Sequence, residues 1–134
     1  MRCVRLFTDV NGMTHAQEGR LDLQTAERGD LTTAKIPAKG IFFKQTSAGQ
    51  QGHWHSDLHR QFVVTLQGCL LFETQAGEQF ELNVGDVLFT EEAGHQGHRW
   101  RIIGNEPWQR AYIILPKDVQ LPFQATNEKK MNSL

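Results

Sequence analysis

Residues 61–90 read QFVVTLQGCLLFETQAGEQFELNVGDVLFT, and this stretch decides the fold. It consists of short runs rich in β-branched and aromatic residues, separated by the glycines Gly68, Gly77 and Gly85. Short runs at roughly 8–12 residue spacing, with turn signals between them, are typical of a β-sandwich or β-barrel. We therefore expect an all-β fold with these glycines at its turns.

The same pattern continues on both sides of this stretch. Further candidate strands lie at residues 41–43, 99–103 and 110–115, with weaker ones at residues 4–8 and 19–23. No segment between residues 40 and 115 has a helical period. We divide the chain into N-terminal strands and loop (residues 1–39), a barrel (residues 40–116) and a C-terminal extension (residues 117–134), frayed from Asn127 onward.

Length and composition exclude several classes of protein. The 134 residues suit one domain, and the net charge of −1 gives no sign of the basic surface that nucleic acids require. No apolar run approaches the roughly 20 residues needed to span a bilayer. Residues 1–9 lack the zones of a secretory signal, and Cys3 and Cys69 suit free thiols in a reducing compartment. We expect a cytoplasmic protein without nucleic-acid or membrane partners.

The candidate strand at residues 61–67 bears on assembly. Alternation places Gln61, Val63 and Thr65 on one face and Phe62 and Val64 on the other. Both faces carry apolar groups, so we expect both to be covered. One cover is the barrel interior, and the other is an N-terminal strand or a second subunit. Because a symmetric dimer is the commonest oligomer, we expect a homodimer.

Five of the six histidines lie between residues 53 and 98, which suggests a metal site. His53 and His55 are one residue apart, so on an extended chain both point to the same face. His98 would add a third nitrogen if its strand lay beside theirs, and the amide oxygen of Gln61 is a candidate fourth ligand. The sequence predicts one divalent ion, and imidazole ligands suit iron, nickel, manganese or zinc.

The pattern does not assign a role to two further histidines as directly. His59 shares the parity of Gln61 and is the alternative fourth ligand, whereas His95 reads as a solvated loop residue. Trp100 shares the parity of His98 and is expected to line a ligand pocket. The other expected pocket residues are Val63 and Thr65.

The stretch from His53 to His98 resembles the cupin family. The family's first motif is matched by His53, His55 and Gly68, and its second motif by Gly85 and His98. Gln61 stands where the family has a glutamate ligand. The resemblance implies a cupin-type double-stranded β-helix, also called a jelly-roll barrel, with one metal ion in its mouth. An amide cannot neutralise the ion, so a three-histidine site with Gln61 outside it is the alternative.

The resemblance also implies a range of activities. Small-molecule dioxygenases, isomerases, decarboxylases and lyases occur in the family, and Arg60 or Arg101 is a candidate carboxylate anchor. Glu91 or Glu92, in the loop before His98, is a candidate base. The alternative is a non-catalytic barrel that binds a small ligand or senses a metal, and a third reading leaves the histidines metal-free.

Overall fold

The computed structural model describes residues 1–93 and 96–126, and the regular elements of this part of the chain are strands apart from one helical turn. The strands are β1 (Arg2–Thr8), β2 (Thr14–Leu21), β3 (Gln24–Thr25), β4 (Leu31–Thr32), β5 (Gly40–Thr46), β6 (Gln61–Gln67), β7 (Cys69–Thr74), β8 (Gln79–Leu82), β9 (Val87–Glu91), β10 (His98–Ile103), β11 (Trp108–Ile114) and β12 (Phe123–Ala125). The helical turn is η1 (Glu27–Gly29). The prediction of an all-β fold is confirmed, and no helix in the described residues is long and apolar enough to cross a membrane.

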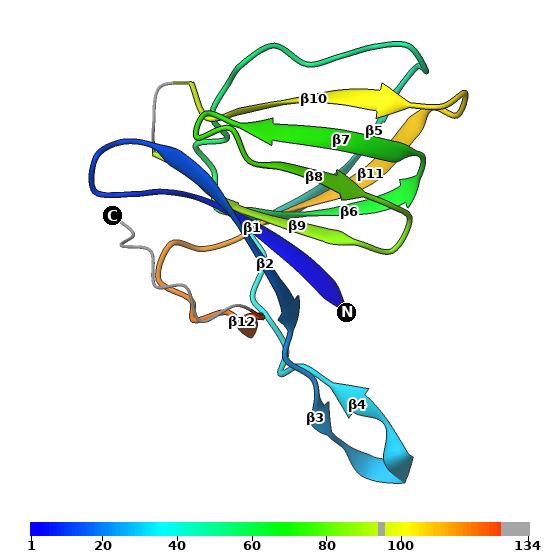
Figure 1. The fold of residues 1–134 in the computed structure, drawn as a ribbon. Coiled ribbons are helices and arrows are strands. Elements are labelled where there is room, and N and C mark those ends of the chain that lie inside the picture. Colours follow the sequence, from blue (N-terminus) through cyan, green and yellow to red (C-terminus); the bar gives the residue numbers. More distant parts are fainter. Residues whose placement is uncertain (94–95, 127–134) are drawn as a thin grey trace.

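Two sheets face each other across the core (Figure 1). The larger has seven strands in the order β12-β2-β1-β9-β6-β11-β5, and the smaller has three in the order β10-β7-β8. Paired strands run antiparallel except β1 and β9, which are parallel. Two packed sheets of this kind are consistent with a cupin-type jelly roll. The hairpin of β3 and β4 projects from this body (Figure 1).

The core fills the space between the sheets. Val63 of β6 and Leu88 of β9 pack against Phe72 of β7 and Trp108 of β11, and all four side chains are buried. The indole N–H of Trp108 donates to Oγ1 of Thr65 over 3.2 Å, which satisfies a buried donor. Burying each large apolar side chain stabilises the fold by about 1.5–3 kcal/mol. Val63 and Thr65 thus face the interior.

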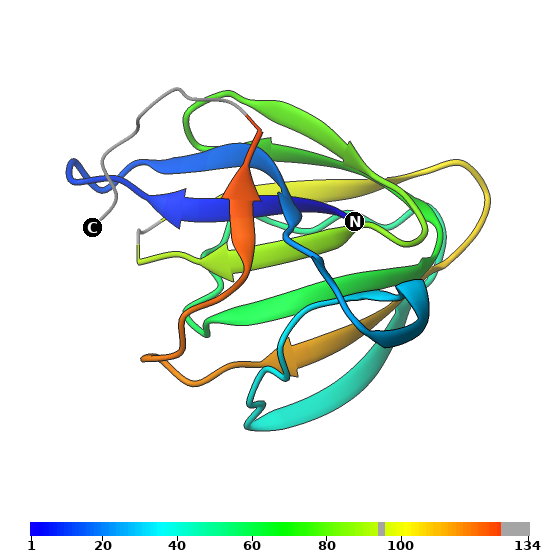
Figure 2. The same cartoon turned by 90° about the horizontal axis from the view of Figure 1, so that it is seen from below.

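Part of the outer face of the larger sheet is covered by the chain itself. Phe62 and Val64 point to this side and pack with Ile36, Leu121 and Phe123. The last two belong to the segment that follows β11 and runs over the sheet (Figure 2). Phe62 and Val64 therefore do not require a second subunit, whereas Leu66 on the same face of β6 is 49% exposed. The homodimer stays a prediction.

Arg60 holds the covering segment in place. Its Nη1 donates to three carbonyl oxygens of that segment, those of Pro116, Lys117 and Val119. Its Nε donates to Oε1 of Glu91 over 3.1 Å. Nε and Nη1 of Arg60 are thus engaged in holding the structure together.

The edge strand β5 and the two termini differ in how they are packed. Phe43, on the edge strand β5, is 73% exposed. Strand β1 lies inside the larger sheet, between β2 and β9, so the N-terminal residues form part of the sandwich. The expected frayed tail, residues 127–134, lies outside the described residues.

Replacing Gly19 by alanine is expected to loosen β12. A Cβ at this position in β2 would lie 2.4 Å from the carbonyl oxygen of Gln124 and 2.4 Å from the ring of Phe123. We expect Gly19→Ala to lower the free energy of unfolding by about 1–3 kcal/mol, measured by urea denaturation. Gly40→Ala is the matched control, because a Cβ there meets nothing within 4 Å. Equal effects of the two substitutions would show that β12 does not depend on this close approach.

Candidate metal centre

Two mutual hydrogen bonds bring His55 and His98 together. His98 opens β10, and the extended segment that precedes β6 runs beside it. The N–H of His55 donates to the carbonyl of His98 (3.0 Å), and the N–H of His98 donates to that of His55 (2.9 Å). Residues opposite each other on antiparallel chains project their side chains to the same face. The two imidazole centroids accordingly lie 4.5 Å apart.

Asp57 brings a carboxylate between the two rings. Its Oδ1 lies 3.4 Å from Nε2 of His55, and its Oδ2 lies 3.6 Å from Nε2 of His98. One donor atom from each of the three residues falls within 4.8 Å of the others. Both imidazoles therefore turn the same nitrogen toward one carboxylate.

The spacing of these donor atoms suits shared ligation. Nitrogen and oxygen ligands of zinc lie about 2.0–2.2 Å from the ion, which puts neighbouring tetrahedral ligands about 3.3 Å apart. The separations of 3.4 and 3.6 Å are close to that value and long for charge-assisted hydrogen bonds. Two neutral imidazoles and one carboxylate also reduce the charge of a divalent ion by one unit. The residues present thus fit a divalent metal ion.

Behind His98 lies a second carboxylate, that of Glu92. The side chain of Glu92 is 0% exposed, and its Oε1 lies 2.8 Å from Nδ1 of His98, an ion-pair contact not aligned as a hydrogen bond. The same oxygen accepts the backbone N–H of Asp57 over 3.1 Å. A carboxylate on the far nitrogen of a ligating histidine fixes the ring and raises its basicity. Glu92 therefore suits a positioning role.

Gly97 makes this packing possible. Its φ of +67° is left-handed, and a Cβ there would lie 2.2 Å from the carbonyl oxygen of His55 and 2.6 Å from Oε2 of Glu92. Only glycine combines that conformation with so close an approach. The glycine before His98 thus allows the His55 backbone to reach β10.

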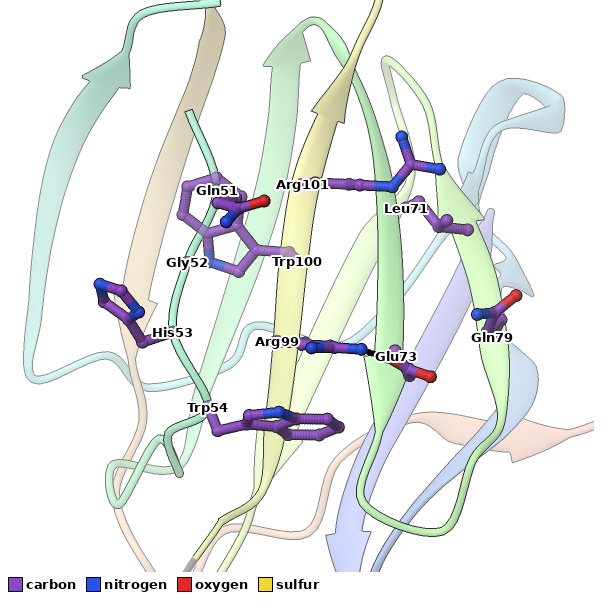
Figure 3. Close-up of a pocket in the computed structure, with 10 residues that line it drawn as sticks. All are labelled: Gln51, Gly52, His53, Trp54, Leu71, Glu73, Gln79, Arg99, Trp100 and Arg101. Carbon is purple, nitrogen blue, oxygen red and sulfur yellow. Dashed lines mark hydrogen bonds and ion pairs between the residues drawn. The ribbon is translucent and has the colours of Figure 1, made fainter. Parts of the chain in front are cut away.

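A one-residue irregularity separates His53 from His55. Gln51 bridges to Arg101 and His55 bridges to His98, so four steps along one chain stand opposite three along the other. Such a bulge breaks the simple alternation of side chains. His53 is exposed and is not part of the cluster of donor atoms. Figure 3 shows its ring and that of Trp54 on opposite sides of the segment.

Trp54 belongs to the outer face of the smaller sheet, which is hollowed into a cavity of about 610 Å³ (Figure 3). The guanidinium of Arg99 stacks over the ring of Trp54 at 4.7 Å and pairs with Glu73 at 2.6 Å. Arg101 is also on this face. The outward parity of Arg99 and Arg101 separates both from the donor cluster, on the inner side of β10.

A second cavity of about 640 Å³ is lined by two of the three donor residues, His55 and Asp57, and by most of the residues expected at the site. The third donor residue, His98, is 1% exposed and is not one of the lining residues. The cavity is lined by His53, His55, Asp57, His59, Gln61 and Trp100, among others. Gln61 is buried on the inner face of β6, and His59 is exposed. Val63 and Thr65 lie in the core and are not part of this lining, and His95 lies outside the described residues.

The charges of the cluster are coupled. The close contact with Asp57 raises the pKa of His55 to about 9, against the opposing effect of burial. Burial alone would raise the pKa of Asp57, but its contact with His55 and the charges of His98, His55 and Lys44 outweigh this. The pKa of Asp57 therefore lies below its ordinary value, and this carboxylate is ionised at neutral pH.

Sequence reasoning considered Glu92 as a base and missed Asp57 altogether. A signal for Asp57 was present, because it follows His55 at the same spacing of two that separates His55 from His53. Extending the alternation by one step would have included it. No local pattern could have shown that Glu92 turns toward His98.

Comparisons with known proteins add little to this geometry. No family model matches the chain, and no curated protein does. Among solved structures, the chain is similar to a crystal structure of a DUF861 family protein from Thermotoga maritima, with 20% identity. The match covers 57% of this chain and 77% of that one, with a TM-score of 0.43. We take no residue role or activity from so distant a likeness.

The His55–Asp57 pair gives the metal-free protein a definite pH dependence. Because folding raises the pKa of His55 from about 6.5 to about 9, its contribution to stability is complete below pH 6.5 and is lost as pH rises through 9. We expect the melting temperature in EDTA to fall across this range by on the order of a few degrees. The effect is reduced because the side chain is 42% exposed.

His55→Gln is the comparison for this measurement, because it keeps a polar side chain that does not titrate. The variant should show a flatter melting profile between pH 6.5 and 9 than the wild type. Superimposable slopes would mean that His55 does not carry the effect.

Proposed function

We propose that this chain is a cupin-type barrel that holds one divalent metal ion through His55, Asp57 and His98, next to a cavity for a small molecule. The observation that carries the proposal is the position of the Asp57 carboxylate, 3.4 and 3.6 Å from Nε2 of the two histidines. The motif resemblance between His53 and His98 supports the family assignment. Gln61 lines the same cavity and is a candidate further metal ligand.

The donor set bears on the choice of metal and chemistry. Two histidines and one carboxylate with open positions form the set used by non-haem iron(II) oxygenases, and zinc, nickel and manganese also accept these ligands. A bound ion would polarise an oxygen of the ligand and leave positions open to water or dioxygen. The chain itself orients His98 through Glu92. A small-molecule dioxygenase or isomerase is therefore the enzyme class we favour.

A binding role is the second candidate, and the placement of the acidic residues favours it. Glu91 pairs with Arg5 and Arg60, and Glu92 faces His98, so both candidate bases are engaged. Of the carboxylates in the described residues, Asp57 is the one that lines the inner cavity. A site without a spare base suits ligand binding or metal sensing better than it suits proton transfer.

Metal content of the protein purified without an affinity tag tests the site directly. We expect about one equivalent of bound metal, lost on chelation and restored by titration with iron(II), nickel, manganese or zinc. Asp57→Ala, His55→Ala and His98→Ala should each abolish stoichiometric binding, because each removes one donor. His53→Ala is the matched control and should keep the metal. Loss of metal in His53→Ala but not in Asp57→Ala would refute the assignment.

Glu92→Gln separates the positioning role from ligation. The substitution preserves shape but removes the charge that faces Nδ1 of His98. We expect metal affinity to fall by about 10–100-fold, measured by calorimetric titration, with stoichiometry unchanged. Unaltered affinity in a folded variant would show that Glu92 does not orient His98.

A further inference from the structure

Arg110 points a guanidinium into the interior of the sandwich. It lies on β11 between Trp108 and Tyr112, which share its inward parity because they are two residues away on either side. Arg110 is only 2% exposed. Arginine is almost never buried to this extent without an anionic partner, because an unpaired charge is costly away from water.

The contacts of Arg110 hold the side chain in place but leave its charge unbalanced. Nη1 donates to Oγ1 of Thr46 (2.8 Å) and to the carbonyl of Trp108 (3.2 Å), and Nε donates to the hydroxyl of Tyr112 (3.3 Å). The guanidinium carbon lies 3.8 Å above the ring of Trp108. Among the described residues, the carboxylates that pair with arginines pair with Arg2, Arg5, Arg60 and Arg99, and none pairs with Arg110.

Four other arginines differ from Arg110 in this respect. Arg2, Arg5, Arg60 and Arg99 each pair with at least one carboxylate, and each is more exposed than Arg110. These four ion pairs thus form at positions where contact with water already lowers the free-energy cost of a charged side chain. The arginine for which pairing would matter most is left without an anion from the described part of the protein.

Arg110 lines the same cavity of about 640 Å³ as His55 and Asp57. Lys44 of β5 adds a second cation to this cavity. The rings of Phe42 and Tyr112 stack at 4.5 Å with an interplanar angle of 5°, and the ring of Trp100 also faces the space. The lining is therefore cationic and aromatic in part, and it also includes His55 and Asp57 of the donor cluster.

We propose that Arg110 anchors the carboxylate of a small, flat organic acid in the inner cavity, with Lys44 supplying additional positive charge. The inference rests on the proposed function, because it names the class of ligand taken up by the cavity beside the metal. The planar fork of a guanidinium matches the two oxygens of a carboxylate, whereas the aromatic rings suit an unsaturated or aromatic body. The carboxylate of such a ligand would neutralise the charge of Arg110.

Benzoate is a suitable probe, and benzamide is its uncharged counterpart of the same shape. The titration uses metal-free protein in EDTA, so that binding does not depend on the metal ion. We expect benzoate to bind and benzamide to bind at least about tenfold more weakly, because hydrogen bonds to a charged group are the stronger ones. Equal affinities for the two compounds would overturn the proposal.

Variants locate the anchor. Arg110→Gln should weaken benzoate binding at least about tenfold, and Lys44→Gln should weaken it severalfold. Arg101→Gln, which removes a cation from the outer face of the smaller sheet, should leave the affinity unchanged. Wild-type affinity in a folded Arg110→Gln protein, or a loss confined to Arg101→Gln, would overturn the proposal.

The three tryptophans provide a readout that does not depend on the folding of any variant. In an NMR titration of the wild type, benzoate should shift the indole N–H signals of Trp100 and Trp108, whose rings lie 5.9 and 3.8 Å from the guanidinium carbon of Arg110. The signal of Trp54, on the outer face, should not move. Shifts of Trp54 alone would place the ligand elsewhere and refute the inference.

Metal content measured on the wild-type protein and on Arg110→Gln distinguishes failure of this inference from failure of the metal site. Arg110→Gln should lose benzoate binding and keep the metal, because His55, Asp57 and His98 are intact. Metal binding without Arg110-dependent benzoate binding would support the metal site and refute the role of Arg110. Arg110-dependent benzoate binding without metal binding would support the role of Arg110 and refute the metal site.

Discussion

The backbone bridge between His55 and His98 is the constraint on which the inner site depends. Its two hydrogen bonds, of 3.0 and 2.9 Å, tie the segment before β6 to the first residue of β10. Without this bridge, the two rings would sit on separate segments with no fixed separation. Asp57 follows the bridge by two residues, so the same contact also sets the position of the carboxylate. Gly97 permits the approach because it has no Cβ.

Charge is distributed unevenly around the inner cavity. Asp57 and Glu92 place negative charge beside the histidines, and Arg110 and Lys44 place positive charge on the β5–β11 side. Asp57, Lys44 and Arg110 belong to one lining, whereas Glu92 is buried against His98. A molecule with an anionic group at one end and a hydrogen-bond donor at the other would meet complementary charge at both ends. The cavity therefore has a negatively charged side and a positively charged side.

The rest of the chain keeps this cavity rigid. The inner face of the larger sheet packs on the smaller sheet, and part of its outer face is covered by the segment that follows β11. Arg60 fastens that segment through carbonyl contacts and pairs with Glu91, the last residue of β9. Glu92 follows directly, so this anchoring extends to the residue behind His98. Stability of the sheet and orientation of the histidine are thus linked through neighbouring residues.

The sequence by itself determined the all-β class, because alternation along a strand and glycine at turns are local properties. It also marked His55 and His98 as residues to be brought together, through spacing and motif resemblance. Only the tertiary structure decided that Asp57 faces both rings, that His53 stands apart and that Arg110 shares the cavity. These outcomes depend on the register between segments more than forty residues apart and on a one-residue bulge between Gln51 and His55. Local sequence patterns carry no information on such pairing, because a shift of one residue reverses the face to which a side chain points.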